Sequence, residues 1–202
     1  MKRSNFLKLA MAAASGLTLP FASFAGRRAK TSLMSGARAQ RQRADKGFFV
    51  AAGKDRSNKS ISLFEGDTFY AKVSTADTSG DIYMFESTRE KKGGPPLHVH
   101  YEQDEWWYVL KGEFIIKVGD QVYNVKAGDS VFGPRKVPHA FAKIGEGEAK
   151  LLMFFQPAGK MEAFFTAMSQ GATNNMTPEQ NKEFRKAHGF EPVGPPLTYQ
   201  KQ

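Results

Sequence analysis

The sequence predicts a mainly β protein, built as a sandwich or barrel, with short helices near its C-terminus. From residue 47 to residue 157, short runs of strand-favouring residues are separated by turn signals, a pattern typical of sandwiches and barrels. After Pro157 the apolar residues recur at helical spacing instead. With 202 residues, 41% of them hydrophobic, the chain is long enough for one domain with a sizeable core. We therefore predict a barrel at 47–157 and a helical extension at 158–202 that packs on it.

The predicted strands follow one another through the barrel region. Gly119 and Asp120 form a hairpin turn between two of them, and Lys111 and Gly112 separate two others. The expected strands lie at 48–50, 68–73, 81–86, around 96–100, and at 105–110, 114–118, 121–125, 130–132 and 151–155.

Two helices are expected in the C-terminal extension. Residues 161–168 have an apolar face at helical spacing. Thr177 has the character of an N-cap and Pro178 of a first helical position, so a second helix should run to about His188. The tail at 194–197 is then expected to be extended.

The first 25 residues have the order of a secretory signal peptide: a basic start, an apolar stretch at 9–24 and small residues before Gly26. Residues 2–8 also resemble a twin-arginine export signal, with Lys2 in place of the first arginine. We expect cleavage after Ala25 and export to the periplasm or outside the cell, with no stable membrane anchor after cleavage. A short hydrophobic anchor or a disordered leader is the alternative.

The formal net charge of +9 is unevenly distributed along the chain. Residues 26–46 are strongly basic and form a linker that we expect to be disordered, with contact to an anionic surface as the lesser possibility. Residues 47–202 carry equal numbers of basic and acidic side chains, which argues against nucleic acid as a partner. The chain has no cysteine, so any metal must be held by nitrogen and oxygen ligands.

Three of the four histidines lie at metal-ligand spacing. His98 and His100 are two residues apart on a predicted strand, so both side chains project to the same face. Glu105 opens the next expected strand, and His139 follows further along the chain. Imidazole and carboxylate ligands suit one divalent transition metal, and Fe, Mn, Ni, Co, Cu or Zn would each fit. The sequence therefore predicts a metal site of three histidines and one glutamate.

Neighbours of these ligands are candidates for the walls of a substrate pocket, because residues two apart in a strand share a face. Parity with Glu105 and His139 selects four of them, and three further candidates lie on other predicted strands. Each could equally be plain barrel core. The opposite parity on the same strand predicts that Trp106, Tyr108 and Leu110 face outward. The predicted pocket residues are Trp107, Val109, Phe114, Ile116, Phe132, Val137 and Phe141.

The first histidine motif resembles that of the cupin superfamily, which has two histidines one residue apart, then a glutamate and a glycine. His98, His100, Glu105 and Gly112 stand at those positions. The likeness covers roughly residues 65–157.

The second cupin motif is met by Gly128, Pro134 and His139. Lys136 stands where the motif has glycine, and Lys143 where it has asparagine. These departures concern a turn and a contact beside the site rather than ligation.

The resemblance implies a double-stranded β-helix, or jelly-roll, with His98, His100, Glu105 and His139 as the metal ligands, and a possible homodimer. The segment at 95–107 and the tail at 191–197 look most like small bacterial quercetin dioxygenase-like cupins. That narrower likeness implies a metal-dependent oxygenase acting on an aromatic or enolisable small molecule, with Glu105 as general base.

Two other functions stay open, because one fold hosts many reactions. One is a non-catalytic cupin that binds a metal or a small molecule. The other is a metal-dependent sugar isomerase or lyase, which would need more polar pocket walls than the predicted ones.

Overall fold

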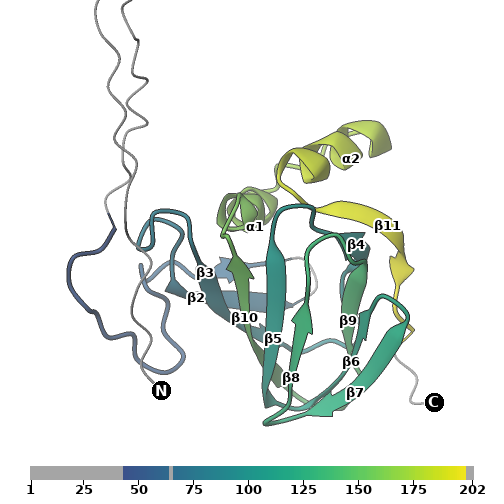
Figure 1. Ribbon diagram of the computed structural model, residues 1–202, viewed down its shortest axis with the longest axis horizontal. Coiled ribbons are helices and arrows are strands. Elements are labelled where there is room, and N and C mark those ends of the chain that lie inside the picture. The colour runs from purple at the N-terminus through teal and green to yellow at the C-terminus, as the bar shows by residue number, and fades with distance from the viewer. Residues whose placement is uncertain (1–42, 64–65, 199–202) are drawn as a thin grey trace, which may run out of the picture. The chain divides into compact units, whose positions relative to one another are not determined.

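The computed structural model describes residues 43–63 and 66–198 (Figure 1). The predicted signal peptide at 1–25 and most of the predicted linker lie outside the described residues. Among the helices of the described part, none has the length and apolar character needed to cross a membrane.

The described residues form two antiparallel sheets that pack into a jelly-roll β-sandwich, with two helices at one end (Figure 1). This confirms the predicted mainly β fold class. The six-stranded sheet has the order β1 (Ile61–Ser62), β2 (Asp67–Val73), β3 (Tyr83–Arg89), β10 (Ala149–Gln156), β5 (Asp104–Lys111) and β8 (Ser130–Gly133). The five-stranded sheet has the order β11 (Glu191–Pro196), β4 (Pro96–Val99), β9 (His139–Lys143), β6 (Glu113–Val118) and β7 (Gln121–Lys126).

Strand β5 shows how side-chain alternation builds the sandwich. Trp107 and Val109 are buried between the sheets, whereas Trp106, Tyr108 and Leu110 are exposed on the outer face, as their parity predicted. Aromatic side chains from both sheets fill the interior. The core includes Tyr83, Phe85, Trp107, Phe114, Ile116, Leu151 and Phe155.

The turn at Gly112 is restricted to glycine. This residue has φ of +84°, and a Cβ added there would lie 2.6 Å from the Cβ of Ala149. The predicted hairpin through Gly119 and Asp120 is also confirmed, since it joins β6 to β7.

The strand predicted at 48–50 is wrong. Residues 43–60 contain no strand, and both Phe48 and Phe49 are exposed. The segment is instead held by the buried carboxylate of Asp55, which accepts a hydrogen bond of 2.7 Å from the backbone NH of Ala71 in β2. The apolar run at 48–50 therefore forms no strand, because no neighbouring strand pairs with it.

Both predicted helices are confirmed. Helix α1 (Met161–Ser169) buries Met161, Phe164 and Met168, and α2 (Pro178–Ala187) begins with a capping box between Thr177 and Gln180.

The tail predicted to be extended is a strand of the sheet. Strand β11 pairs antiparallel with β4, the strand that carries His98. The chain end is therefore part of the sandwich beside the predicted site.

Candidate metal centre

The four predicted ligands meet where the two sheets face each other. His98 lies on β4 and His100 directly follows that strand, while His139 opens β9. The Cα atoms of His98 and His139 are direct cross-strand partners. Glu105 comes from β5 in the other sheet. The cluster therefore bridges the sandwich.

One carboxylate oxygen is the centre of the cluster. Oε2 of Glu105 lies 3.1 Å from Nε2 of His139, 3.3 Å from Nε2 of His100 and 3.6 Å from Nε2 of His98. One ligand atom from each of the four residues lies within 4.8 Å of all the others. All four side chains are buried.

The backbone fixes the tautomer of each imidazole. Every Nδ1 lies within hydrogen-bond distance of a carbonyl oxygen, which can only accept, so each Nδ1 carries the proton. The distances are 2.8 Å from His98 to Pro96, 2.6 Å from His100 to Gly189 and 2.9 Å from His139 to Val137. The three Nε2 lone pairs therefore face the Glu105 carboxylate.

Such a convergence of lone pairs and negative charge is suited to a cation among them. Nε2 of His100 is buried and has no hydrogen-bond partner among the described residues. Because Nδ1 already holds the proton of each ring, Nε2 can donate to Glu105 only if the imidazole becomes charged. A divalent metal satisfies all four groups at once, so the residues fit the metal that the sequence predicts.

The electrostatics favour neutral imidazole beside an ionised carboxylate. Burial lowers the pKa of His98 to about 4, which outweighs the opposing effect of Glu105. Burial alone would raise the pKa of Glu105, but hydrogen bonds from Nε2 of His100, His139 and His98 would hold that pKa well below its usual value, and a bound cation would do the same when those rings are neutral. His98 therefore offers a free lone pair at neutral pH, and Glu105 a negative charge.

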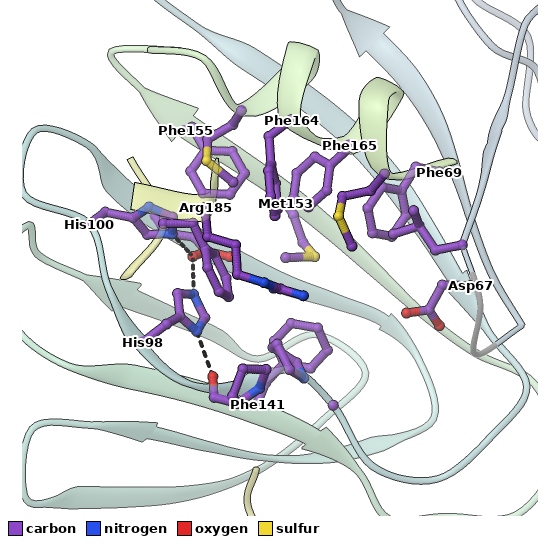
Figure 2. Close-up of a pocket in the computed structure, with 18 of the residues that line it drawn as sticks. Asp67, Phe69, His98, His100, Phe141, Met153, Phe155, Phe164, Phe165 and Arg185 are labelled. Atoms are coloured by element: carbon purple, nitrogen blue, oxygen red, sulfur yellow. Dashed lines mark hydrogen bonds and ion pairs between the residues drawn. The ribbon is translucent and has the colours of Figure 1, made fainter. Parts of the chain in front are cut away.

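A cavity of about 240 Å³ opens beside the cluster (Figure 2). His98, His100 and Glu105 line it, and its remaining walls are mainly aromatic and methionine side chains. The apolar lining residues include Phe69, Phe141, Met153, Phe155, Met161, Phe164, Phe165, Met168 and Phe190. Three charged side chains also reach it, namely Asp67, Arg89 and Arg185.

The structure separates the seven predicted pocket residues into three groups. Phe141 lines the cavity. Val137 is half-buried outside the lining, and Phe132 is 54% exposed, so it does not face the barrel interior as predicted. In β8 it is Val131 that points inward, and Phe132 takes the outer face. Four residues are buried core rather than cavity wall, namely Trp107, Val109, Phe114 and Ile116.

Sequence reasoning missed the walls that other parts of the chain provide. Met153 and Phe155 point inward on β10. Side-chain alternation along the predicted strand at 151–155 could have placed both on the same face. Phe164 lies on the apolar face of α1, whose helical period was visible. Nothing local marks Phe190 or Arg185 as cavity residues, because they reach the site only through the tertiary fold.

The two departures from the second cupin motif are both accommodated. Lys136 has φ of +67°, so it adopts the left-handed conformation that favours glycine, and its NH donates to the carbonyl of His100 at 2.7 Å. Lys143 is buried and its Nζ donates to two carbonyl oxygens at 2.9 Å, those of Glu90 and Gly145.

Known proteins share this architecture and part of the sequence. Residues 80–155 match the sequence model described as the cupin domain. An uncharacterized protein of Methanocaldococcus jannaschii is 34% identical over 61 residues, which are 30% of this chain and 49% of that protein. The chain thus aligns with about half the length of that relative.

Two solved structures resemble the fold. KdgF from a Halomonas species has a TM-score of 0.48 and 17% identity, with 55% of this chain and 94% of that chain covered. A RmlC-like cupin from Shewanella frigidimarina has a TM-score of 0.46 and 20% identity, with 60% and 99% covered. At these values the likenesses carry no functional assignment. The matched residues include all of His98, His100, Glu105 and His139, and the fold is the expected jelly-roll, so residues 80–155 form a cupin domain.

Proposed function

We propose that the protein is a metal-dependent cupin oxygenase that acts on an aromatic or enolisable small molecule. The observation that carries this proposal is that His98, His100 and Glu105 line a cavity whose other walls are mainly aromatic. When bound, a divalent metal would supply a Lewis acid and, if redox-active, electron transfer with dioxygen.

The histidines would hold the ion in a fixed geometry. Their Nδ1 bonds to the carbonyls of Pro96, Gly189 and Val137 orient the rings, so the Nε2 atoms are set for ligation before the ion arrives. The four residues would hold the ion, and the cavity beside them would admit the substrate.

Glu105 is the candidate general base. Its carboxylate lines the cavity and is ionised, so it is placed to accept the proton of a substrate hydroxyl that enters beside it. The proton moves from that hydroxyl to the carboxylate and leaves a phenolate or enolate, which is the electron-rich form that dioxygen attacks.

The apolar walls favour an aromatic ring over a sugar. Phe141, Phe155 and Phe164 offer flat surfaces and no hydrogen-bonding groups on their side chains, whereas a sugar needs several polar partners. The walls also exclude water from the proton transfer. These features support an oxygenase over the isomerase or lyase alternative.

Metal content is the first test of this function. Elemental analysis of the purified protein should find close to one divalent transition metal per chain. The double variant His98→Ala, His139→Ala should lose the metal. The control His188→Ala should keep the metal, because His188 caps the C-terminus of α2 and lies outside the cluster.

Oxygen uptake is the second test. An oxygen electrode should record substrate-dependent uptake with catechols or a flavonol. Glu105→Gln should reduce the rate at least 100-fold with the metal retained, the scale of general-base catalysis. The matched variant Glu102→Gln changes an exposed carboxylate three residues away and should have no effect. Stoichiometric metal without uptake on any of these compounds would instead favour an isomerase, a lyase or a binding protein.

A further inference from the structure

Arg185 is a cation of the cavity that has no anionic partner. It belongs to α2, outside the residues that match the cupin domain, yet its side chain lines the cavity together with His98 and Glu105. Across residues 43–63 and 66–198, no carboxylate forms an ion pair with it. An unpaired guanidinium in a mainly apolar cavity is costly unless a ligand supplies the counter-charge.

Neighbouring side chains hold this guanidinium in place. Its Nε donates to Oδ1 of Asn181, one turn earlier on α2. The guanidinium carbon lies 5.5 Å from the ring centre of Phe190 and 5.9 Å from that of Phe164. Figure 2 shows the end of the side chain directed into the cavity. Its two terminal nitrogens remain available to a ligand.

The other ionic groups of the cavity wall are already matched. Arg89 forms a two-pronged ion pair with Asp67, its Nε lying 2.6 Å from Oδ1, and it also donates to the carbonyl of Gly93. Both side chains are buried. Glu105 faces the histidines. Arg185 is thus the charge left over among the cavity-lining residues, and a divalent metal would add further positive charge.

The cavity size limits what can bind there. A dry cavity of about 150 Å³ accommodates benzene, so the 240 Å³ found here suits one substituted ring. A flavonol has three rings and would exceed this volume. A planar carboxylate on a single ring matches both the fork of a guanidinium and the flat phenylalanine walls.

We propose that Arg185 is a substrate-binding residue that recognises a carboxylate, and that the ligand of this cavity is a single-ring aromatic acid. The ring packs between the phenylalanines, and the carboxylate pairs with Arg185. For the hydroxyl end this assignment rests on the proposed oxygenase function, in which Glu105 receives the hydroxyl proton. The carboxylate end rests on Arg185 alone.

Calorimetric titration without oxygen tests the carboxylate end separately from catalysis. The probes are 3,4-dihydroxybenzoate and salicylate, each compared with its neutral amide of the same shape. The metal-loaded full-length protein should bind each acid about 10- to 100-fold more tightly than its amide, as expected for charge-assisted hydrogen bonds. Arg185→Met should remove this preference while leaving the affinity for the amides and the metal content unchanged.

A matched variant controls for the helix. Lys186→Met changes the adjacent, exposed cation of α2 and should keep the full preference for the acids. Arg185→Lys retains the positive charge but not the planar guanidinium that binds a carboxylate through two hydrogen bonds. This variant should therefore keep only part of the preference for the acids. Asn181→Ala should also weaken the preference, because it frees the guanidinium from its anchor.

Two outcomes would overturn the proposal. One is a wild-type protein that binds the acids no better than the amides, including the case in which none of the probes binds. The other is a preference that survives in Arg185→Met. If the preference depends on Arg185 but no compound supports oxygen uptake, the oxygenase function fails and the carboxylate site stands. The reverse pattern would leave the oxygenase and remove the site.

Discussion

The phenyl ring of Phe190 stacks on the imidazole ring of His98, with centroids 4.2 Å apart and an angle of 18° between the planes. The preceding residue, Gly189, accepts the Nδ1 hydrogen bond of His100 through its carbonyl. Two consecutive residues directly before the C-terminal strand thus orient two ligands of the predicted metal site. The segment before β11 therefore contributes to the geometry of the predicted metal site.

Phe190→Ala should destabilise the fold and loosen the site. Phe190 is buried, so we expect the free energy of unfolding to fall by about 3 kcal/mol, typical of a phenylalanine deleted from a core. Phe132→Ala is the matched control, since this phenylalanine is exposed, and should cost less than about 1 kcal/mol. Urea denaturation measures both. Equal losses would contradict the role assigned to Phe190.

Metal should stabilise the folded chain, because the four ligands converge only after folding. At a free-metal concentration of 100 times Kd the gain is about 2.7 kcal/mol. The melting temperature of chelator-treated protein should therefore rise when metal is restored. His139→Ala should abolish the rise and His188→Ala should preserve it. A rise that persists in His139→Ala would show that the ion binds elsewhere.

Asp55 should make stability depend on pH in the acid range. Burial alone would raise the pKa of this carboxyl, but hydrogen bonds from Ser57, Lys59 and Ala71 outweigh it and hold the pKa below its ordinary value of 3.8. The stability gained is therefore complete above about pH 5 and lost as the pH falls through the folded-state pKa.

The matching variant is Asp55→Asn. At pH 7 it should lower the free energy of unfolding by about 1–3 kcal/mol. In denaturation experiments at progressively lower pH, the difference from wild type should shrink, since protonated Asp55 loses the same bonds. A difference that stays constant down to pH 2 would refute the assignment.

Lys143 should be needed for the loop that follows β9. Its Nζ satisfies the carbonyls of Glu90 and Gly145, so Lys143→Met leaves both without this donor, at about 1–3 kcal/mol. Lys126→Met, on an exposed position of β7, serves as control and should be nearly neutral. Chemical denaturation separates the two. Metal content should be unchanged in both, because neither residue contacts the cluster.

The sequence was sufficient to predict features that depend on local spacing. The shared face of His98 and His100 and the outward parity of Trp106 follow from the period of a strand, and the start of α2 follows from Thr177 and Pro178.

The cavity was harder to predict, because its walls come from segments that are distant in sequence. Parity places Trp107 inside the sandwich, but cannot say whether it packs in the core or lines a void. That distinction depends on where α1 and the segment around Phe190 lie against the sheets, which no short pattern encodes. Phe132 was predicted to line the pocket, but the neighbouring Val131 takes the inner face instead.

The pairing of β11 with β4 also bears on when the protein can acquire its metal. A ribosome has made all four ligands once it has passed His139, but not yet the carbonyl of Gly189 or the ring of Phe190 that hold two of them. A nascent chain at that stage contains the four ligand residues but lacks the two contacts that orient His98 and His100. Loading of the ion is therefore expected only after residues 189 and 190 have been made, and a truncated product that ends before Gly189 should contain little metal although all its ligand histidines are present.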